Sequence, residues 1–362
     1  MRKWQVGWGP VVLCNMNCSF CYSKNSRDSI NSLGYDEWVN FIDGNHEKID
    51  AINYGTGENT MSDDWFKLIK YIRDNYPNIS QALTTNGYLS ERIIENSNYG
   101  RIIQKSIEEI DISLDFCDPQ KHNDLRGQKH AYKWAIETLE YCSDKDIEPT
   151  IVFLGCSDTL KKENIDGLFE IAKKYNSKLR MNIYRPTNGI DEISKKFIPT
   201  FEQIINILYY INDKYKILSI CDPLFSSILT DSNYEIDPSG SNSLRILGDG
   251  SITPSTYLIS DEFKRLNIKN PQSLKVIEEN NIFKDITLAP TPKECKECKH
   301  VNTCNGGVYD RRYLWYGDFK ERDPYCPFRR SDNSTFKKVK IKKDDSFSSI
   351  HDGYLPTIFF SS

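Results

Sequence analysis

The chain alternates short apolar runs, rich in β-branched and aromatic residues, with longer amphipathic segments. The apolar runs predict strands at residues 4–13, 49–54, 81–85, 110–114, 149–154, 178–184 and 216–221. Segments with helical spacing follow at residues 35–42, 62–75, 90–107, 130–142, 160–174 and 201–214, with a break expected at 98–100 in the third of them. Because strand and helix alternate, we expect parallel strands with right-handed crossovers. About six such units predict an α/β fold built as a partial (βα)6 barrel, similar to a TIM barrel.

The pattern changes near residue 234. Residues 234–242 are rich in Asp, Pro, Ser, Gly and Asn, which predicts a boundary loop. The following stretch, 244–253, predicts a hairpin that turns at an Asp-Gly pair. The expected division is a barrel at 1–233, a small cysteine-rich domain at 234–330 and a C-terminal tail at 331–362. The apolar residues 354–360 of the tail are expected to dock on the barrel or on a partner.

Composition excludes several classes of function. The 362 residues are 38% hydrophobic and 27% charged, as in ordinary globular proteins. The formal net charge of −4 provides no basic field for nucleic acid. No apolar run approaches the roughly 18 residues needed to span a membrane, and the N-terminus lacks a signal-peptide core. We therefore expect a cytoplasmic protein without a nucleic-acid or membrane partner.

Eleven cysteines in a reducing compartment indicate metal binding or catalysis rather than disulfides. Cys14, Cys18 and Cys21 form a CxxxCxxC group. Thiolates at this density prefer zinc or an iron–sulfur cluster. Three ligands on a four-iron cluster leave one iron open to a substrate or cofactor. The alternatives are a zinc knuckle or three unrelated thiols.

The CxxxCxxC spacing, with Tyr22 directly after Cys21, resembles the signature of the radical S-adenosylmethionine (AdoMet) superfamily. The resemblance implies a partial (βα)6 barrel and a [4Fe–4S] cluster on Cys14, Cys18 and Cys21, with AdoMet on the open iron. It also implies that one electron from the cluster cleaves AdoMet to methionine and a 5′-deoxyadenosyl radical. A low-potential donor such as flavodoxin or ferredoxin is the expected source of that electron.

Two further motifs after predicted strands match the order of this family. Gly57-Glu58 resembles the GGE motif, in which the glycine permits close approach and the glutamate accepts from the methionyl ammonium. Asn86, in Thr85-Asn86-Gly87, resembles the TNG motif that shapes the AdoMet pocket.

Five more residues are candidates on the same resemblance. Tyr22 is expected to pack near the adenine. Ser113 is expected to contact the ribose or the carboxylate, and Asp115 the ribose or the substrate. Arg126 could neutralise the AdoMet carboxylate, with a surface or structural role as the alternative. Arg185, just past the sixth predicted strand, is a candidate to contact either AdoMet or the substrate.

A second cysteine group lies in the small domain. Its members are Cys295, Cys298, Cys304 and Cys326. Four thiolates can close a metal site, and this group resembles the outer cluster of a SPASM domain, which implies an auxiliary [4Fe–4S] cluster. Ser255 and Val308 stand where the family has cysteines of the inner cluster, so we expect the inner cluster to be absent. A zinc site is the alternative occupant.

Three other thiols fall near predicted strand ends, namely Cys117, Cys156 and Cys221. A thiol has a weak S–H bond, so each is a candidate hydrogen-atom donor to a carbon radical. Radical epimerases that resemble this chain use such a cysteine, and Cys221 is preferred here over Cys156 and Cys117. The alternative for each is a buried small apolar side chain.

These features together predict a radical AdoMet enzyme that modifies a ribosomally made peptide by epimerisation or crosslinking. Only 13 residues precede Cys14, so we expect no winged-helix precursor-binding domain before it. One alternative is a small-molecule epimerase or dehydrogenase that acts on a sugar, an aminoglycoside or a nucleoside. Another is a non-catalytic metal-binding scaffold, for which the Gly57-Glu58 and Ser113 motifs would have no use.

Overall fold

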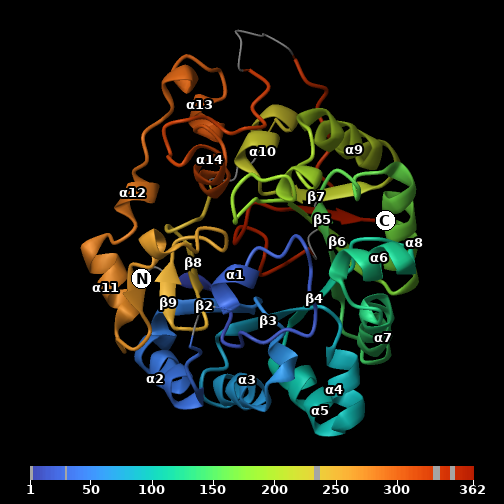
Figure 1. Ribbon diagram of the computed structural model, residues 1–362, viewed down its shortest axis with the longest axis vertical. Helices are drawn as coiled ribbons and strands as arrows, with labels where there is room; N and C mark the ends of the chain where they lie inside the picture. The colour runs from blue at the N-terminus through green and yellow to red at the C-terminus, as the bar shows by residue number, and fades with distance from the viewer. Residues whose placement is uncertain (1–2, 29–30, 232–236, 329–334, 343–346) are drawn as a thin grey trace.

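The computed structural model describes residues 3–28, 31–231, 237–328, 335–342 and 347–362, which are built around one eleven-stranded sheet (Figure 1). Six parallel strands pair in chain order. They are β1 (Trp4–Trp8), β2 (Ile49–Tyr54), β3 (Ser80–Thr85), β4 (Glu109–Ser113), β5 (Pro149–Gly155) and β6 (Lys178–Ile183). The predicted α/β barrel order is confirmed.

Helices lie around the outside of this sheet (Figure 1). Those of the barrel are α1 (Lys24–Asp28), α2 (Tyr35–Asn45), α3 (Asp63–Asn75), α4 (Leu89–Glu95), α5 (Ser97–Ser106), α6 (Pro119–Arg126), α7 (Ala131–Asp144), α8 (Lys162–Lys174), α9 (Phe201–Lys214) and α10 (Pro223–Leu229). Those of the small domain are α11 (Ser273–Asn280), α12 (Lys284–Thr287), α13 (Val301–Cys304) and α14 (Tyr309–Tyr316). Within the described part of the chain, no helix has the length and apolar character needed to cross a membrane.

Local sequence explains where several helices begin. Thr200 and Gln203 form a reciprocal capping box at the start of α9. Asp118 and Asp222 cap α6 and α10, and each is followed by a proline at the first helical position, where no N–H is needed.

Two element boundaries differ from the sequence prediction. The first strand, expected to reach residue 13, ends at Trp8. Pro10 has no N–H to continue a ladder, and the residues beyond it form the cysteine loop instead. The break expected at 98–100 in the segment 90–107 lies instead at Asn96, which adopts an extended backbone and whose side chain accepts from the N–H of Asn98.

The sheet continues beyond β1 into the small domain. Strand β8 (Ser243–Ile246) pairs in parallel with β1, and β9 (Ser251–Thr253) and β10 (Leu266–Asn267) follow antiparallel. The predicted hairpin is present, with Gly250 at φ +80° in its turn. The small domain is therefore joined to the barrel through a continuous sheet.

The other end of the sheet contains the C-terminus of the chain. Strand β11 (Ile358–Ser361) lies between β6 and β7 (Lys216–Ile220) and is antiparallel to both. The predicted tail thus supplies an interior strand of the barrel sheet. The predicted boundaries at 233/234 and 330/331 lie outside the described residues.

A buried charged cluster holds this C-terminal segment against the barrel. The Nδ1 atom of His351, a fully buried residue, lies 3.0 Å from a carboxylate oxygen of Glu109 and 3.0 Å from one of Asp111. Arg180 donates to the same oxygen of Asp111 at 2.5 Å. Burial and Arg180 lower the pKa of His351, but Asp111 and Glu109 outweigh them and raise it above its ordinary 6.5.

We expect the stability of the protein to fall as pH rises through neutrality. Because the pKa of His351 is raised in the folded state, its protonation stabilises the fold. This stabilisation is complete below the unfolded pKa of 6.5 and is lost as pH rises through the folded pKa. His351→Gln should cost about 1.5–3 kcal/mol at about pH 6 and flatten the dependence. Urea unfolding between about pH 6 and pH 9 measures this, with exposed His130→Gln as the control. A dependence that survives in His351→Gln would contradict the assignment.

Candidate active site

The loop after β1 carries the first cysteine group. Cys14, Cys18 and Cys21 are free thiols, and all three line one cavity of about 190 Å3 at the carboxyl ends of the strands. Backbone contacts fix the loop, because the N–H of Glu58 donates to Leu13 O at 2.7 Å and that of Asn17 to Arg126 O at 3.3 Å. The three predicted cluster ligands are therefore brought together.

Gly57 and Glu58 attach the β2 loop to this cysteine loop. Gly57 has φ +64°, and a Cβ there would lie 2.3 Å from Val11 O, so the position requires glycine. Glu58 is fully buried and accepts hydrogen bonds from Thr85 Oγ1 at 2.9 Å and the N–H of Asn86 at 2.7 Å. Burial raises the pKa of Glu58, although these hydrogen bonds act to lower it. Gly57 lines the cavity and Glu58 does not, so a contact of Glu58 with the methionyl ammonium stays a prediction.

The donor set fits a metal cluster. Burial raises the pKa of Cys14, and it raises that of Cys18 to about 11, where Arg126 acts in the opposite direction. The guanidinium of Arg27 lies 3.9 Å from Cys21 Sγ, and Asn86 Nδ2 lies 3.9 Å from Cys14 Sγ. Three soft donors that share one buried cavity, with a cation and an amide beside them, suit a [4Fe–4S] cluster held by three thiolates.

Residues after β4 and β6 complete the wall. Asp115 is fully buried and accepts from Arg126 Nε at 2.7 Å and the N–H of Leu154 at 2.9 Å. Burial lowers the pKa of the neighbouring His122 to about 4, so it is neutral. Ser113, Asp115, Arg126, Asn86, Tyr22 and Arg185 all line the cavity. The predicted AdoMet-binding residues other than Glu58 thus share one cavity.

Sequence reasoning missed two residues of this cavity. Arg27 donates to Val12 O at 2.6 Å and contacts Cys21, and nothing in its own sequence context indicated it. Tyr257 comes from the loop after the β9 strand, and its ring lies 5.4 Å from that of Tyr22. Tyr257 lies two residues after Ser255, which stands where the family has a cysteine, and this was the one sequence feature that could have indicated it.

The three candidate hydrogen-atom donors lie outside the cavity that the cysteine loop lines. Cys221 is buried under the C-terminal segment, and its Sγ donates to Asp352 Oδ1 at 2.8 Å. Cys117 and Cys156 line a separate cavity of about 690 Å3. Position near a strand end was correctly expected, but it did not place these thiols beside the cluster ligands, and a donor role stays a prediction.

The second cysteine group also converges. Its four thiols are free and line a second cavity, which is also lined by Leu224 and Ile228 of α10. Burial, together with the neighbouring Cys326 and Cys298, raises the pKa of Cys295 to about 11. Four mutually repelling thiolates suit either an iron–sulfur cluster or zinc.

A polar network occupies the region where the two inner-cluster positions fall. Ser255 Oγ donates to Asp310 Oδ2 at 2.9 Å, and the N–H of fully buried Val308 donates to Asp323 Oδ2 at 3.1 Å. Neither residue supplies a thiolate, and the absence of an inner cluster stays a prediction.

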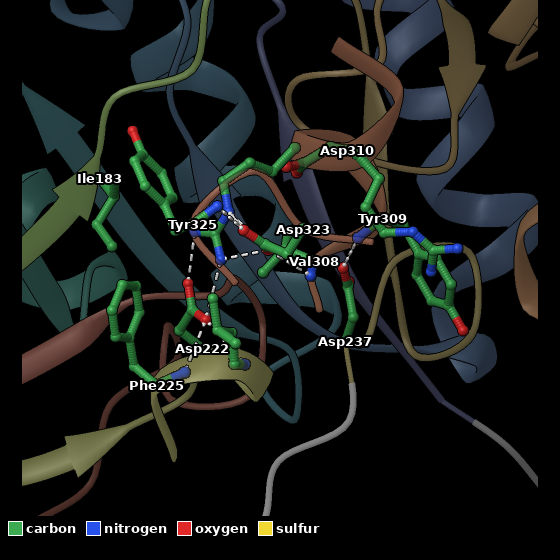
Figure 2. A network of polar contacts seen from close by, with 12 residues as sticks. Ile183, Asp222, Phe225, Asp237, Val308, Tyr309, Asp310, Asp323 and Tyr325 are labelled. Atoms are coloured by element: carbon green, nitrogen blue, oxygen red, sulfur yellow. Dashed lines mark hydrogen bonds and ion pairs between the residues drawn. The ribbon is translucent and has the colours of Figure 1, made fainter. Parts of the chain in front are cut away.

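Arg311 is the centre of this network. Its guanidinium bonds Asp222 at 2.7 Å and Asp323 at 2.6 Å, and all three side chains are at most 1% exposed. The contacts of Asp222 and Asp323 can be followed in Figure 2. Because Asp222 begins α10 and Asp323 precedes Cys326, the network fastens the end of the barrel to the second cysteine group.

Comparison with known proteins agrees with this geometry. Residues 9–175, which include the cysteine loop and the motifs after β2, β3 and β4, match the model of the Radical SAM superfamily. Residues 9–175 thus form a radical SAM domain. The protein is an enzyme, and this superfamily implies AdoMet and a [4Fe–4S] cluster as its cofactors.

Two curated relatives match over most of this radical SAM chain. Mycofactocin maturase MftC of Mycolicibacterium smegmatis is 22% identical, over 88% of this chain and 81% of its own length. The AdoMet-dependent heme synthase of Methanosarcina barkeri is 23% identical, over 90% of this chain and 96% of its own length.

Solved structures share the fold. Streptococcus suis SuiB bound to its precursor peptide SuiA has a TM-score of 0.70 at 18% identity, covering 90% of this chain and 76% of SuiB. The enzyme anSMEcpe with bound AdoMet has a TM-score of 0.72 at 18% identity, covering 89% of this chain and 94% of anSMEcpe.

Proposed function

We propose that the protein cleaves AdoMet reductively and modifies a peptide substrate. The observation that carries this is the single cavity lined by Cys14, Cys18 and Cys21 together with the AdoMet-motif residues. The peptide substrate is supported by two similar proteins, a mycofactocin maturase and SuiB, whose structure holds a precursor peptide.

The chain's own residues divide the work around this cavity. The three thiolates hold the cluster, and Gly57 keeps the neighbouring loop close enough for AdoMet to reach it. Asp115 holds Arg126 at 2.7 Å, and the charge of Arg126 would neutralise the AdoMet carboxylate. When bound, the two cofactors supply hydrogen-atom abstraction from an unactivated C–H bond. We propose flavodoxin or ferredoxin as the electron donor in the cytoplasm.

The cavity favours crosslinking over epimerisation. Inversion of a stereocentre needs a hydrogen-atom donor that faces the substrate. Among the described residues that line the cavity, the thiols are Cys14, Cys18 and Cys21, and all three are cluster ligands on this proposal. Crosslinking needs no such donor, but the substrate radical must then lose one electron and one proton, and the proposed auxiliary [4Fe–4S] cluster would accept the electron.

We further propose that residues 234–330 form a SPASM-like domain with one auxiliary [4Fe–4S] cluster. Support comes from the convergence of Cys295, Cys298, Cys304 and Cys326 on one cavity, with Ser255 and Val308 in place of further ligands. Zinc would fit the same donors, and metal analysis separates the two.

Anaerobic incubation with AdoMet and dithionite tests the proposed function. We expect 5′-deoxyadenosine to accumulate, and a peptide encoded beside the gene to become two hydrogens lighter. If 5′-deoxyadenosine fails to form after full cluster reconstitution, the proposal is wrong. If 5′-deoxyadenosine forms but only a small molecule is modified, the substrate is a small molecule and not a peptide. The heme synthase relative makes a porphyrin the first small molecule to try.

A further inference from the structure

Arg185 lies two residues after the end of β6 and lines the proposed active-site cavity. Its side chain is 1% exposed. Two of its three nitrogens are hydrogen-bonded within the protein. Nε donates to Asp310 Oδ1 at 3.0 Å, and Nη1 donates to Ile183 O at 2.5 Å. The guanidinium is therefore held in one orientation.

The third nitrogen, Nη2, has no partner. Of the described residues that line the cavity, Arg185 alone has a buried side-chain polar atom without a hydrogen bond. A buried donor without an acceptor is costly, and such atoms in folded proteins call for an explanation. An acceptor on a bound ligand is the explanation that its place on the cavity wall favours.

The surroundings prepare this nitrogen for an anion. Asp310 is itself fixed by Ser255 Oγ at 2.9 Å, and the guanidinium carbon lies 5.1 Å from the centre of the Tyr257 ring. A guanidinium anchored in this way loses little freedom when it binds a carboxylate.

The other two arginines of the cavity already have partners close to the cysteine loop. Arg27 contacts Cys21 Sγ at 3.9 Å, and Arg126 is paired with Asp115 at 2.7 Å. Arg185 instead contacts Tyr257 and Asp310, which belong to the small domain. This side of the cavity is where a substrate would lie on the proposed function.

We propose that Arg185 recognises a carboxylate of the substrate, with Nη2 donating to one of its oxygens. The substrate class is then a peptide that carries an acidic side chain close to the residue being modified. This inference rests on the proposed function and narrows its substrate. Arg185 acts as a specificity-determining residue, and Asp310 orients it.

Two capped tripeptides test the inference as probes, acetyl-Gly-Glu-Gly-amide and acetyl-Gly-Gln-Gly-amide. The protein is reconstituted anaerobically and saturated with AdoMet without reductant, and dissociation constants are measured by calorimetry. We expect the wild type to bind the glutamate probe about ten- to a hundred-fold more tightly, as for a charge-assisted bond. Arg185→Gln should bring the ratio to about one, and Arg185→Lys should keep part of it.

Two further variants separate recognition from folding. Arg185→Gln combined with Asp310→Asn leaves no unpaired buried charge, and it should show the same lost discrimination. Exposed Arg101→Gln is the matched control and should keep the wild-type ratio. A ratio is insensitive to a partly unfolded fraction, so a purely structural role of Arg185 would leave it unchanged.

Two results would overturn the inference. One is a wild type that binds both probes equally or binds neither. The other is an Arg185→Gln variant that keeps the ratio and loses affinity for AdoMet, which would assign the arginine to the AdoMet carboxylate. AdoMet cleavage without peptide is measured on the same samples. If cleavage persists while discrimination fails, only the substrate inference is wrong, and if cleavage is absent the proposed function is wrong.

Discussion

Replacement of Arg311 by leucine is expected to destabilise the protein by about 3–5 kcal/mol, the range found when one partner of a buried ion pair is removed. The change leaves Asp222 and Asp323 facing each other without a cation, and both are at most 1% exposed. The pKa of Asp323 is already raised by burial even with Arg311 beside it. Unfolding in urea, followed by circular dichroism, measures the loss.

The matched control for this prediction is Arg265→Leu. That arginine pairs with Asp285 at 2.7 Å, but both side chains are about 40% exposed, so the pair should contribute about 0–1 kcal/mol. A second comparison adds Asp222→Asn and Asp323→Asn to Arg311→Leu, which should recover part of the loss by removing the unpaired charges. If Arg311→Leu costs no more than the exposed control, the network does not join the barrel to the small domain as described.

Replacement of Cys14, Cys18 and Cys21 together by alanine is expected to reduce 5′-deoxyadenosine formation to background. The three thiols are the soft donors of the cavity, and without them no cluster is held beside AdoMet. The fold should persist, because these residues lie in a loop and none of them is fully buried. Cleavage is measured by chromatography of the products after anaerobic reduction.

Cys142→Ala is the control for this second prediction. Cys142 is buried in α7 and belongs to neither cysteine group, so its loss should leave AdoMet cleavage intact. Cleavage that continued in the triple variant at the wild-type rate would show that another part of the chain holds the cluster.

Local pattern made much of the fold predictable. Strand and helix periodicity gave the order β1 to β6, and motif spacing brought the predicted AdoMet residues other than Glu58 to one cavity. Strand β11 was not predicted, because its partners β6 and β7 lie more than 130 residues earlier in the chain. A short apolar run does not reveal which strands it will pair with.

The limits at the site have the same physical origin. Cys221 was correctly placed at a strand end, but Asp352 from the C-terminal segment contacts it there, 131 residues further along the chain. Glu58 was expected to contact AdoMet, but its carboxylate accepts hydrogen bonds from Thr85 and Asn86, and whether it also contacts the ligand stays a prediction. Spacing identifies candidate groups, and long-range packing decides which of them faces the cavity.

Iron and acid-labile sulfide per chain, counted after anaerobic reconstitution, test whether each cysteine group holds an iron–sulfur cluster. We expect about eight irons in the wild type and about four in the Cys14, Cys18 and Cys21→Ala variant, as for one four-iron cluster in each cysteine group. About four irons falling to none, with zinc present, would leave the first cluster in place and make the second site structural zinc. An iron content that the triple variant leaves unchanged would contradict the assignment of the active site.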